Sequence, residues 1–533
     1  MTHNLKTILA AGAALTLLAA CGGGGGSNTP TTIITPPPVS EGPTFEAGKF
    51  DPASDFIDQC ENPRAGTSDR AGSTLLEKFW LRSWTDETYL WYDEVTDLDP
   101  ASIADRLDYF AELRTFATTA SGKPKDEFHF SIDTETYEAD RAGEASAGYG
   151  ATFRLLRTSP PRDIRIAYTQ DNGPAGEEGG FLRGDKILEV DGIDAVNGAN
   201  TQADLDILNE AIFPTRVGDT HIFVVEDTNG TQRTVTLETA DVVELPVTDT
   251  AVIDTESGKV GYIHFTTFSP FTSEKAIYDA MIEMEDEDIS DLVLDLRYNG
   301  GGLLAVAAQT GFMIAGDAAT DGRTFDRLTF SDKNPTINPV TGQTLRPTPF
   351  FGTGLDFSLD EDVDLPELDL DRVFILSTER TCSASEAVIN GLRGIDVEVI
   401  LIGSKTCGKP YGFYPTDNCG ETYFTVQFRG ANDKGFGDYA DGFEPEGTSA
   451  FGVQTPGCNI EDDFIGQLGA EDETLLSAAL QFREDGTCPS PDVSVAQSKT
   501  QTPDIFIDSP ADMLSDDRVR DLERLRTLRI EVE

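Results

Sequence analysis

Two short motifs in the second half of the chain hold residues that could act as a nucleophile and a base. Ser383 begins the stretch SASE, which follows the apolar run VFIL. The S-x-x-E spacing is typical of a capping box, and a helix N-terminus can also hold a nucleophilic serine. A serine hydroxyl needs a base, and a lysine that is buried enough to be neutral can be one. Lys409 follows the apolar run VEVILIG and a glycine turn, with Lys405 as its competitor.

The usual base, histidine, is scarce in this chain. The four histidines are His3, His129, His221 and His264, and none lies close in sequence to the serine. Cys382 is a rival nucleophile, but no histidine lies near it, and its thiol would be oxidised if the N-terminal signal described below exports the chain. A serine–lysine pair is therefore the preferred hypothesis.

The elements that must position these residues alternate between strands and helices over residues 246–485. Four apolar runs predict buried strands: GKVGYIHF, DLVLDLR, RVFILS and VEVILIG. Helical patterns separate them, among them SEKAIYDAMIEMED and the segment that follows the glycine turn YNGGG. Such alternation predicts largely parallel pairing in an α/β core.

An upstream segment, residues 141–245, has the order strand, glycine-rich turns, helix, strand. It resembles a PDZ domain in the circularly permuted form of bacterial proteases, most specifically in GFLRGDKILEVDGI. The resemblance implies that Tyr149, Gly150 and Ala151 form the loop that offers backbone N–H groups to a peptide carboxylate. A glycine turn without a ligand is the alternative.

Three motifs, LDLRYNGGGL, SASE and GSKTCGK, follow in this order behind the PDZ-like segment. Together they resemble the carboxyl-terminal processing proteases of serine peptidase family S41, over roughly residues 75 to 480. The resemblance implies a ClpP/crotonase-like core, Ser383 as nucleophile and Lys409 as general base. It also implies an oxyanion hole formed by the N–H of Ala384 and a glycine of the turn, with Gly301 preferred over Gly300.

The sequence departs from the family pattern at one place that matters. Many members carry a glutamine four residues after the lysine, where this chain has Phe413. Glu386 and Gln427 are alternative residues to orient Lys409. The departure motivates a second hypothesis, a catalytically weak lipoprotein that binds peptide C-termini. An enoyl-CoA-hydratase-like enzyme would share the core fold but gives the motifs no role.

Composition limits the partners. The net charge of −54 argues against nucleic acid as a partner.

The first 21 residues, which end in LAAC, resemble a bacterial lipoprotein signal. The resemblance implies lipidation of Cys21 and a membrane anchor, with the outer membrane of the cell envelope favoured. The other six cysteines suggest disulfides, with 15 possible pairings. No metal or organic cofactor is implied.

We therefore expect an α/β multidomain protein that acts as an exported serine endopeptidase on the C-terminal ends of proteins or unfolded chains. The expected parts are a signal peptide at 1–20, a tether at 21–45, a helical region at 46–140, the PDZ-like domain at 141–245, the protease core at 246–485, and a polar tail with a helix at 486–533.

Overall fold

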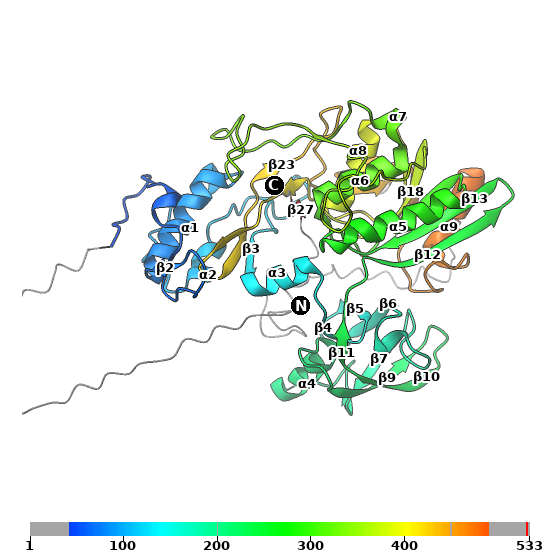
Figure 1. Ribbon diagram of the computed structural model, residues 1–533. Helices are drawn as coiled ribbons and strands as arrows, with labels where there is room; N and C mark the ends of the chain where they lie inside the picture. Colours follow the sequence, from blue (N-terminus) through cyan, green and yellow to red (C-terminus); the bar gives the residue numbers. More distant parts are fainter. Residues whose placement is uncertain (1–41, 200, 448–449, 490–528, 531–533) are drawn as a thin grey trace, which may run out of the picture. The chain divides into compact units, whose positions relative to one another are not determined.

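A six-stranded sheet contains the four predicted apolar runs in this computed structural model (Figure 1). Its strand order is β12-β13-β14-β18-β19-β26, parallel except for the antiparallel pair β12–β13. The strands are β12 (Val247–Thr255), β13 (Gly258–Phe265), β14 (Asp291–Asp295), β18 (Arg372–Ser377), β19 (Glu398–Gly403) and β26 (Gly457–Asn459).

Both faces of this sheet are buried, which explains why its strands read as continuous apolar runs. In β14, Leu292 and Leu294 belong to the core on one face, and Val293 belongs to the core on the other. The first core contains side chains of α5 (Thr272–Asp286), α6 (Leu304–Ala315) and α8 (Ala384–Gly394). The second core is covered by α9 (Thr474–Asp485). The α/β fold class is therefore confirmed.

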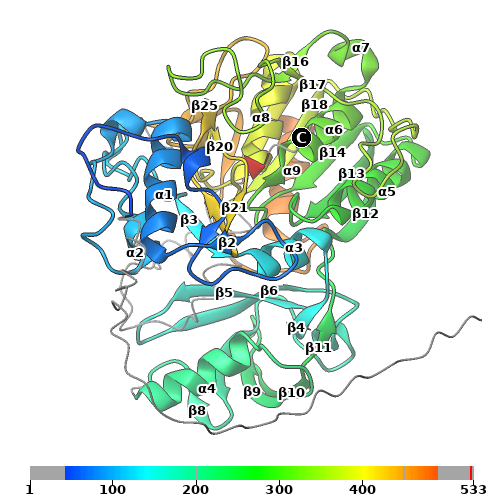
Figure 2. The ribbon, with the colours of Figure 1, turned by 60° about the vertical axis from the view of Figure 1, so that its left-hand side comes forward.

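A second sheet, of order β10-β9-β7-β6-β5, lies in the segment with PDZ-like sequence (Figure 2). Its own core includes side chains from α4 and from the strands. The short pair β4–β11 joins the beginning of the segment to its end, and β5 is an edge strand. The elements are β4 (Ser146–Gly148), β5 (Ala151–Arg157), β6 (Asp163–Thr169), β7 (Lys186–Val190), β8 (Ile193–Asp194), α4 (Gln202–Ile212), β9 (Thr220–Glu226), β10 (Gln232–Glu238) and β11 (Ala240–Val242).

The N-terminal region contains three helices among long connections, so it is less helical than the sequence predicts. The helices are α1 (Thr74–Thr88), α2 (Arg106–Ala111) and α3 (Thr134–Ala142). The aromatic side chains of α1 are packed in a core, with Trp80 and Trp84 stacked 5.1 Å apart. Strand β3 (Phe130–Asp133) pairs with β22 (Glu421–Phe424), which in turn pairs with β21 (Thr416–Asn418). Non-local strand pairing thus ties this region to the protease core.

The remaining short elements lie mostly in loops around the central sheet. They are β1 (Gln59–Cys60), β2 (Arg70–Ala71), β15 (Gly302–Leu303), α7 (Asp317–Thr320), β16 (Thr324–Asp326), β17 (Thr348–Pro349), β20 (Tyr411–Gly412), β23 (Phe428–Arg429), β24 (Phe443–Pro445), β25 (Val453–Thr455), β27 (Arg529–Ile530) and the 3-10 turns Ala53–Asp55, Tyr92–Glu94 and Pro174–Gly176.

The structure describes residues 42–199, 201–447, 450–489 and 529–530. Met1–Thr44 is one unit and Phe45–Glu533 another. The expected signal, Cys21 and most of the tether lie outside the described residues, as does most of the helix predicted in the tail. At Arg529–Ile530 that helix prediction is wrong, because these residues form strand β27, with hydrogen bonding to β15 in place of helical bonding. None of the helices in the described ranges has the length and apolar character to cross a bilayer.

Candidate active site

Ser383 lies in a sharp turn between strand β18 and helix α8. Its backbone has a φ of 59°, a region that non-glycine residues rarely adopt. The side chain is fully buried, and among the described residues its Oγ has no hydrogen-bond partner. A strand, a strained turn and a helix that starts at the next residue are the arrangement that aims a nucleophilic hydroxyl away from the backbone.

The glycine turn and the serine turn are hydrogen-bonded to each other. The carbonyl oxygen of Asn299 accepts hydrogen bonds from the backbone N–H of Cys382, at 3.1 Å, and from the Ser385 hydroxyl, at 3.0 Å. The Thr381 hydroxyl donates to the Leu296 carbonyl at 2.7 Å. Two of the three predicted motifs therefore meet at the ends of β14 and β18, which are paired in the sheet.

The predicted oxyanion donors differ in whether their N–H groups are engaged. Ala384 is the first residue of α8, and in the described part of the chain its N–H has no acceptor, as expected for the first turn of a helix. The Gly301 N–H donates to Oδ1 of Asn299 at 2.9 Å. The Gly300 N–H has no acceptor among the described residues. This conformation thus favours Gly300, the sequence-based alternative, over Gly301.

Lys409 is fully buried, whereas Lys405 is exposed. The Lys409 side chain lies between two aromatic rings, with Nζ 4.5 Å from the ring centre of Phe413 and 4.6 Å from that of Phe128. Phe128 comes from the N-terminal region, so that region contributes to the lysine environment. Of the two lysines weighed from the sequence, only Lys409 is buried.

Glu386 connects the serine turn to the lysine loop. Its Oε2 accepts hydrogen bonds from the backbone N–H of Ser383, at 3.0 Å, and from that of Lys409, at 2.7 Å. Its Oε1 accepts from the Thr406 hydroxyl at 2.6 Å and from the Gly408 N–H at 2.8 Å. One shared oxygen thus holds the backbones of Ser383 and Lys409 within a few ångströms of each other.

The electrostatics of Glu386 explain why it needs so many donors. The carboxyl group is fully buried, and burial raises its pKa, while the hydrogen bonds from Thr406, Lys409, Gly408 and Ser383 lower it. Burial disfavours the charged carboxylate, and these donors offset part of that cost. The capping residue predicted from S-x-x-E is therefore also a link between the two halves of the candidate site.

A disulfide makes a second connection between the same two loops. Cys382, next to the serine, is bonded to Cys407, two residues before the lysine. The thiol hypothesis for Cys382 is therefore wrong in this oxidised state, because a disulfide sulfur is not a free thiolate. The other bonds are Cys60–Cys419 and Cys458–Cys488, so the pairing left open by the sequence is resolved.

Gln427, a candidate for orienting Lys409, is only partly engaged. It is buried, its Oε1 accepts a hydrogen bond from the Tyr414 N–H at 2.9 Å, and its Nε2 has no partner among the described residues. Glu386 acts on the lysine backbone, as described above. Two further residues, Asn299 and Thr406, were missed by sequence reasoning. Their positions next to the GGG and GK motifs are the sequence signal that could have pointed to them.

The three histidines in the described part of the chain contact residues other than Ser383. His129 is hydrogen-bonded to the Thr425 hydroxyl and the Phe110 carbonyl, at 3.0 and 2.9 Å. His221 is paired with Asp191 at 2.7 Å. His264 lies 4.9 Å from the ring of Tyr168. No hydrogen bond joins a histidine to Ser383 in the described ranges, which agrees with the preference for lysine.

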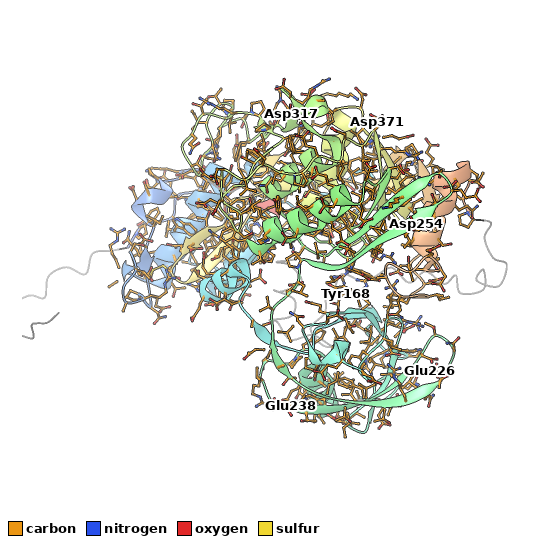
Figure 3. All side chains as sticks on the ribbon, turned by 45° about the vertical axis from the view of Figure 1, so that its right-hand side comes forward. Tyr168, Glu226, Glu238, Asp254, Asp317 and Asp371 are labelled. Carbon is orange, nitrogen blue, oxygen red and sulfur yellow. A yellow bond between two sulfur atoms is a disulfide. The ribbon has the colours of Figure 1, made fainter. Side chains whose placement is uncertain are left out.

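The PDZ-like segment contacts the candidate site through Arg183. Its guanidinium donates to the Tyr298 hydroxyl at 2.7 Å and pairs with Asp462 at 2.5 Å. Tyr168, labelled in Figure 3, stacks on Tyr298 with ring centres 5.7 Å apart. Tyr298 directly precedes Asn299 and the glycine turn, so these contacts connect the segment to the turn next to Ser383.

The predicted peptide-binding loop makes a close backbone contact that only a glycine can accommodate. Gly150 has a φ of 70°, and a Cβ placed there would lie 2.9 Å from the Cα of Gly173. Tyr149 is buried, and its carbonyl accepts a hydrogen bond from the Ala175 N–H at 2.8 Å. Ala151 begins the edge strand β5. The loop thus leads directly into a strand edge.

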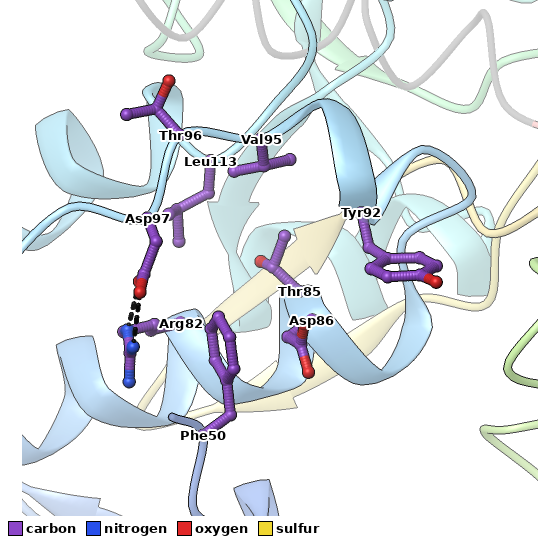
Figure 4. A pocket seen from close by; sticks show the side chains of 9 residues that line it. All are labelled: Phe50, Arg82, Thr85, Asp86, Tyr92, Val95, Thr96, Asp97 and Leu113. Atoms are coloured by element: carbon purple, nitrogen blue, oxygen red, sulfur yellow. Dashed lines mark hydrogen bonds and ion pairs between the residues drawn. The ribbon is translucent and has the colours of Figure 1, made fainter. Parts of the chain in front are cut away.

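A small pocket lies elsewhere, next to α1 in the N-terminal region (Figure 4). It contains the ion pair between Arg82 and Asp97, at 2.6 Å, beside the ring of Phe50. None of the predicted site residues lines it.

Comparisons with known proteins agree with this geometry. Residues 259–413, which include Gly301, Ser383 and Lys409, match the model described as "Peptidase family S41". Carboxyl-terminal-processing peptidase 3, chloroplastic, of Arabidopsis thaliana is 24% identical over 355 residues, 63% of this chain and 60% of that protein. The C-terminal processing peptidase, chloroplastic, of Tetradesmus obliquus is 29% identical over 202 residues, 36% of this chain and 42% of that protein. The chain thus spans less than two thirds of either relative.

A solved structure is similar in fold. A candidate S41 protease from Bacteroides fragilis superposes with a TM-score of 0.56 at 23% identity, over 76% of this chain and 97% of its own. The chain therefore carries a peptidase family S41 domain.

Proposed function

We propose that this protein is a serine endopeptidase in which Ser383 is the nucleophile and Lys409 the general base. The observation that carries the proposal is the Glu386 carboxylate, which accepts hydrogen bonds from the backbones of both residues. The buried Ser383 Oγ has no hydrogen-bond partner among the described residues, so the proposed pair would form its hydrogen bond only when substrate binds.

The proposed reaction is acyl transfer in two steps. The neutral amine of Lys409 takes the hydroxyl proton while Ser383 Oγ attacks the carbonyl carbon of the scissile bond. The resulting ammonium then gives the proton to the departing amine, and water releases the acyl group by the same route. This role requires a neutral amine, and Lys409 is fully buried.

The oxyanion of the tetrahedral intermediate would be stabilised by backbone N–H groups. Ala384 is one donor, supported by its position at the start of α8. The glycine turn supplies the other. Gly301 can serve only if Asn299 releases its N–H, while Gly300 needs no such change.

We further propose that the PDZ-like segment captures the C-terminal end of an exported or unfolded protein. Tyr149, Gly150 and Ala151 would bind the terminal carboxylate, and the peptide would add as a strand to the edge of β5. The names of the two relatives, both C-terminal processing peptidases, agree with this substrate class. The contacts of Arg183 give the segment a route for gating the site.

The place of action is proposed to be the cell envelope, with the chain anchored by a lipid on Cys21. Three disulfides support an oxidising compartment outside the cytoplasm. A binding lipoprotein with little activity is the second candidate. Phe413 favours it, because a phenylalanine cannot hydrogen-bond the lysine amine.

The test uses residues 45–533, the compact unit, with an unfolded, carboxymethylated protein that ends in apolar residues. We expect cleavage by the parent and by the matched control Lys405→Ala, and its loss in Ser383→Ala and Lys409→Ala. Cleavage that survives Lys409→Ala would refute the assigned base. No cleavage by any chain, with the substrate still bound, would favour the binding lipoprotein.

Substrate capture needs its own experiment. A labelled peptide with a free C-terminal carboxylate is expected to bind Ser383→Ala, and the same peptide with an amidated C-terminus is expected to bind at least about tenfold more weakly. Equal affinity for both peptides would contradict recognition of the carboxylate by the Gly150 loop.

A further inference from the structure

Strand β27, Arg529–Ile530, pairs with β15 beside the candidate active site. The pairing is parallel, with Gly302 opposite Arg529 and Leu303 opposite Ile530. Figure 2 shows β27 as the red strand near α8. Gly302 directly follows Gly301 of the glycine turn. The chain thus brings a distant part of its own sequence to the residue next to a predicted oxyanion donor.

The same strand also contacts the lysine side of the site. Strand β20, Tyr411–Gly412, which begins two residues after Lys409, lies in contact with β27. Strand β27 therefore lies between the elements that flank the two catalytic motifs. A peptide whose scissile carbonyl is bound by the glycine turn would lie beside Gly302, the first residue of β15.

Strand β15 offers the edge that an extended substrate would use. It lies outside the central sheet, and in the described part of the chain its strand partner is β27. On its other side, Gly302 bridges Phe268. Peptides bound in extended form gain affinity from main-chain hydrogen bonds to such an edge. Here β27 already makes those contacts.

The sequence around β27 has the pattern of a strand. The stretch LRIEV, residues 528–532, alternates apolar and charged residues, in contrast to the helical spacing upstream of it. Ser383 and Lys409 are fully buried, so an external substrate cannot reach them in this conformation. Some part of the molecule must move before a substrate binds.

We propose that Arg529–Ile530 is an intramolecular occupant of the substrate position along β15, where it competes with external substrate. The expected effect on cleavage rests on the proposed peptidase function, whereas the pairing of Arg529–Ile530 with β15 does not depend on catalysis. A covalently attached competitor acts at an effective concentration of about 1 mM, so one that binds with a Kd of about 0.1 mM raises the apparent KM about tenfold.

The test substitutes proline in the full chain. Ile530→Pro removes a backbone N–H and disfavours pairing with Leu303. Ser515→Pro, a proline substitution outside β27, is the matched control. With the unfolded substrate, we expect Ile530→Pro to lower KM about tenfold with kcat unchanged, and Ser515→Pro to match the parent. An active Ile530→Pro chain with the parent's KM would overturn the inference.

A binding measurement separates this inference from the peptidase proposal. In chains that also carry Ser383→Ala, a fluorescent synthetic peptide of residues 520–533 is the probe. We expect the Ile530→Pro chain to bind it at least about tenfold more tightly than the chain with native Ile530. This result would support the occupancy even if no variant cleaves any substrate. Equal affinity of the two chains would refute it.

Discussion

Replacing Glu386 by glutamine tests the connection between the serine and the lysine. The substitution keeps the shape of the side chain but turns one carboxylate oxygen into an NH2 group. Each oxygen accepts two hydrogen bonds, Oε1 from Thr406 and Gly408, and Oε2 from Ser383 and Lys409. Whichever position the NH2 group takes, it faces donors that it cannot accept from.

The magnitude follows from counting the donors that lose their acceptor. With the NH2 group at the Oε1 position, the Thr406 hydroxyl can turn and accept, and only the Gly408 N–H is left unsatisfied. One buried donor without an acceptor costs about 1–3 kcal/mol, and the remaining bonds weaken because they are no longer charge-assisted. We expect Glu386→Gln to lower the free energy of unfolding by about 3 kcal/mol.

The effect on activity should exceed the effect of destabilisation alone. A displacement of Ser383 relative to Lys409 that costs about 1.4 kcal/mol in the transition state lowers kcat tenfold. We expect at least about a tenfold fall in kcat of Glu386→Gln, measured at a temperature where circular dichroism shows the variant to be folded.

Glu274 supplies a matched control. It is also buried and also accepts four hydrogen bonds, from Gln309 and from three backbone N–H groups of residues 355–359. None of these partners belongs to the serine turn or the lysine loop. Glu274→Gln should therefore lose similar stability and keep its kcat. If both variants lose kcat equally, the link that we assign to Glu386 is refuted.

Two further predictions concern the disulfides and acid stability. Replacing Cys382 and Cys407 together by alanine should lower the free energy of unfolding by about 3 kcal/mol, because the disulfide joins residues 25 apart, and should also lower kcat. Replacing Cys458 and Cys488, which are 30 residues apart, should cost similar stability and leave kcat unchanged. Chemical denaturation measures the stability of both variants, and steady-state kinetics measures kcat. Burial lowers the pKa of His129 to about 4, below its usual 6.5, so the unfolded state takes up a proton first as the pH falls. About 3 kcal/mol of stability that is present above pH 6.5 should therefore be lost by pH 4. Urea unfolding measured as a function of pH should show this loss in the parent and not in His129→Gln.

The parts of the fold that were predictable from sequence depend on local pattern. Strands β14, β18 and β19 read as continuous apolar runs because both of their faces are buried. Ser383 and Lys409 were singled out because each follows such a run. Parallel strands end at the same edge of a sheet, so residues that follow β18 and β19 must lie close together.

The parts that were not predictable depend on contacts between distant segments. The disulfide between Cys60 and Cys419 joins residues 359 apart, and no local spacing selects that partner. The pairing of β3 with β22 and of β27 with β15 has the same origin. In the tail, the sequence predicts a helix, whereas Arg529 and Ile530 form strand β27 and pair with Gly302 and Leu303.

The departure at Phe413 changes how Lys409 is positioned in the proposed pair. A glutamine would hold the amine by a hydrogen bond, which fixes one atom at the end of a long, flexible side chain. Here the backbone of Lys409 is fixed by Glu386, and its side chain is confined between the rings of Phe413 and Phe128. Confinement by two buried rings removes rotamers of this long side chain. A phenylalanine at this position is therefore compatible with a working base, provided that Phe128 from the N-terminal region stays in place.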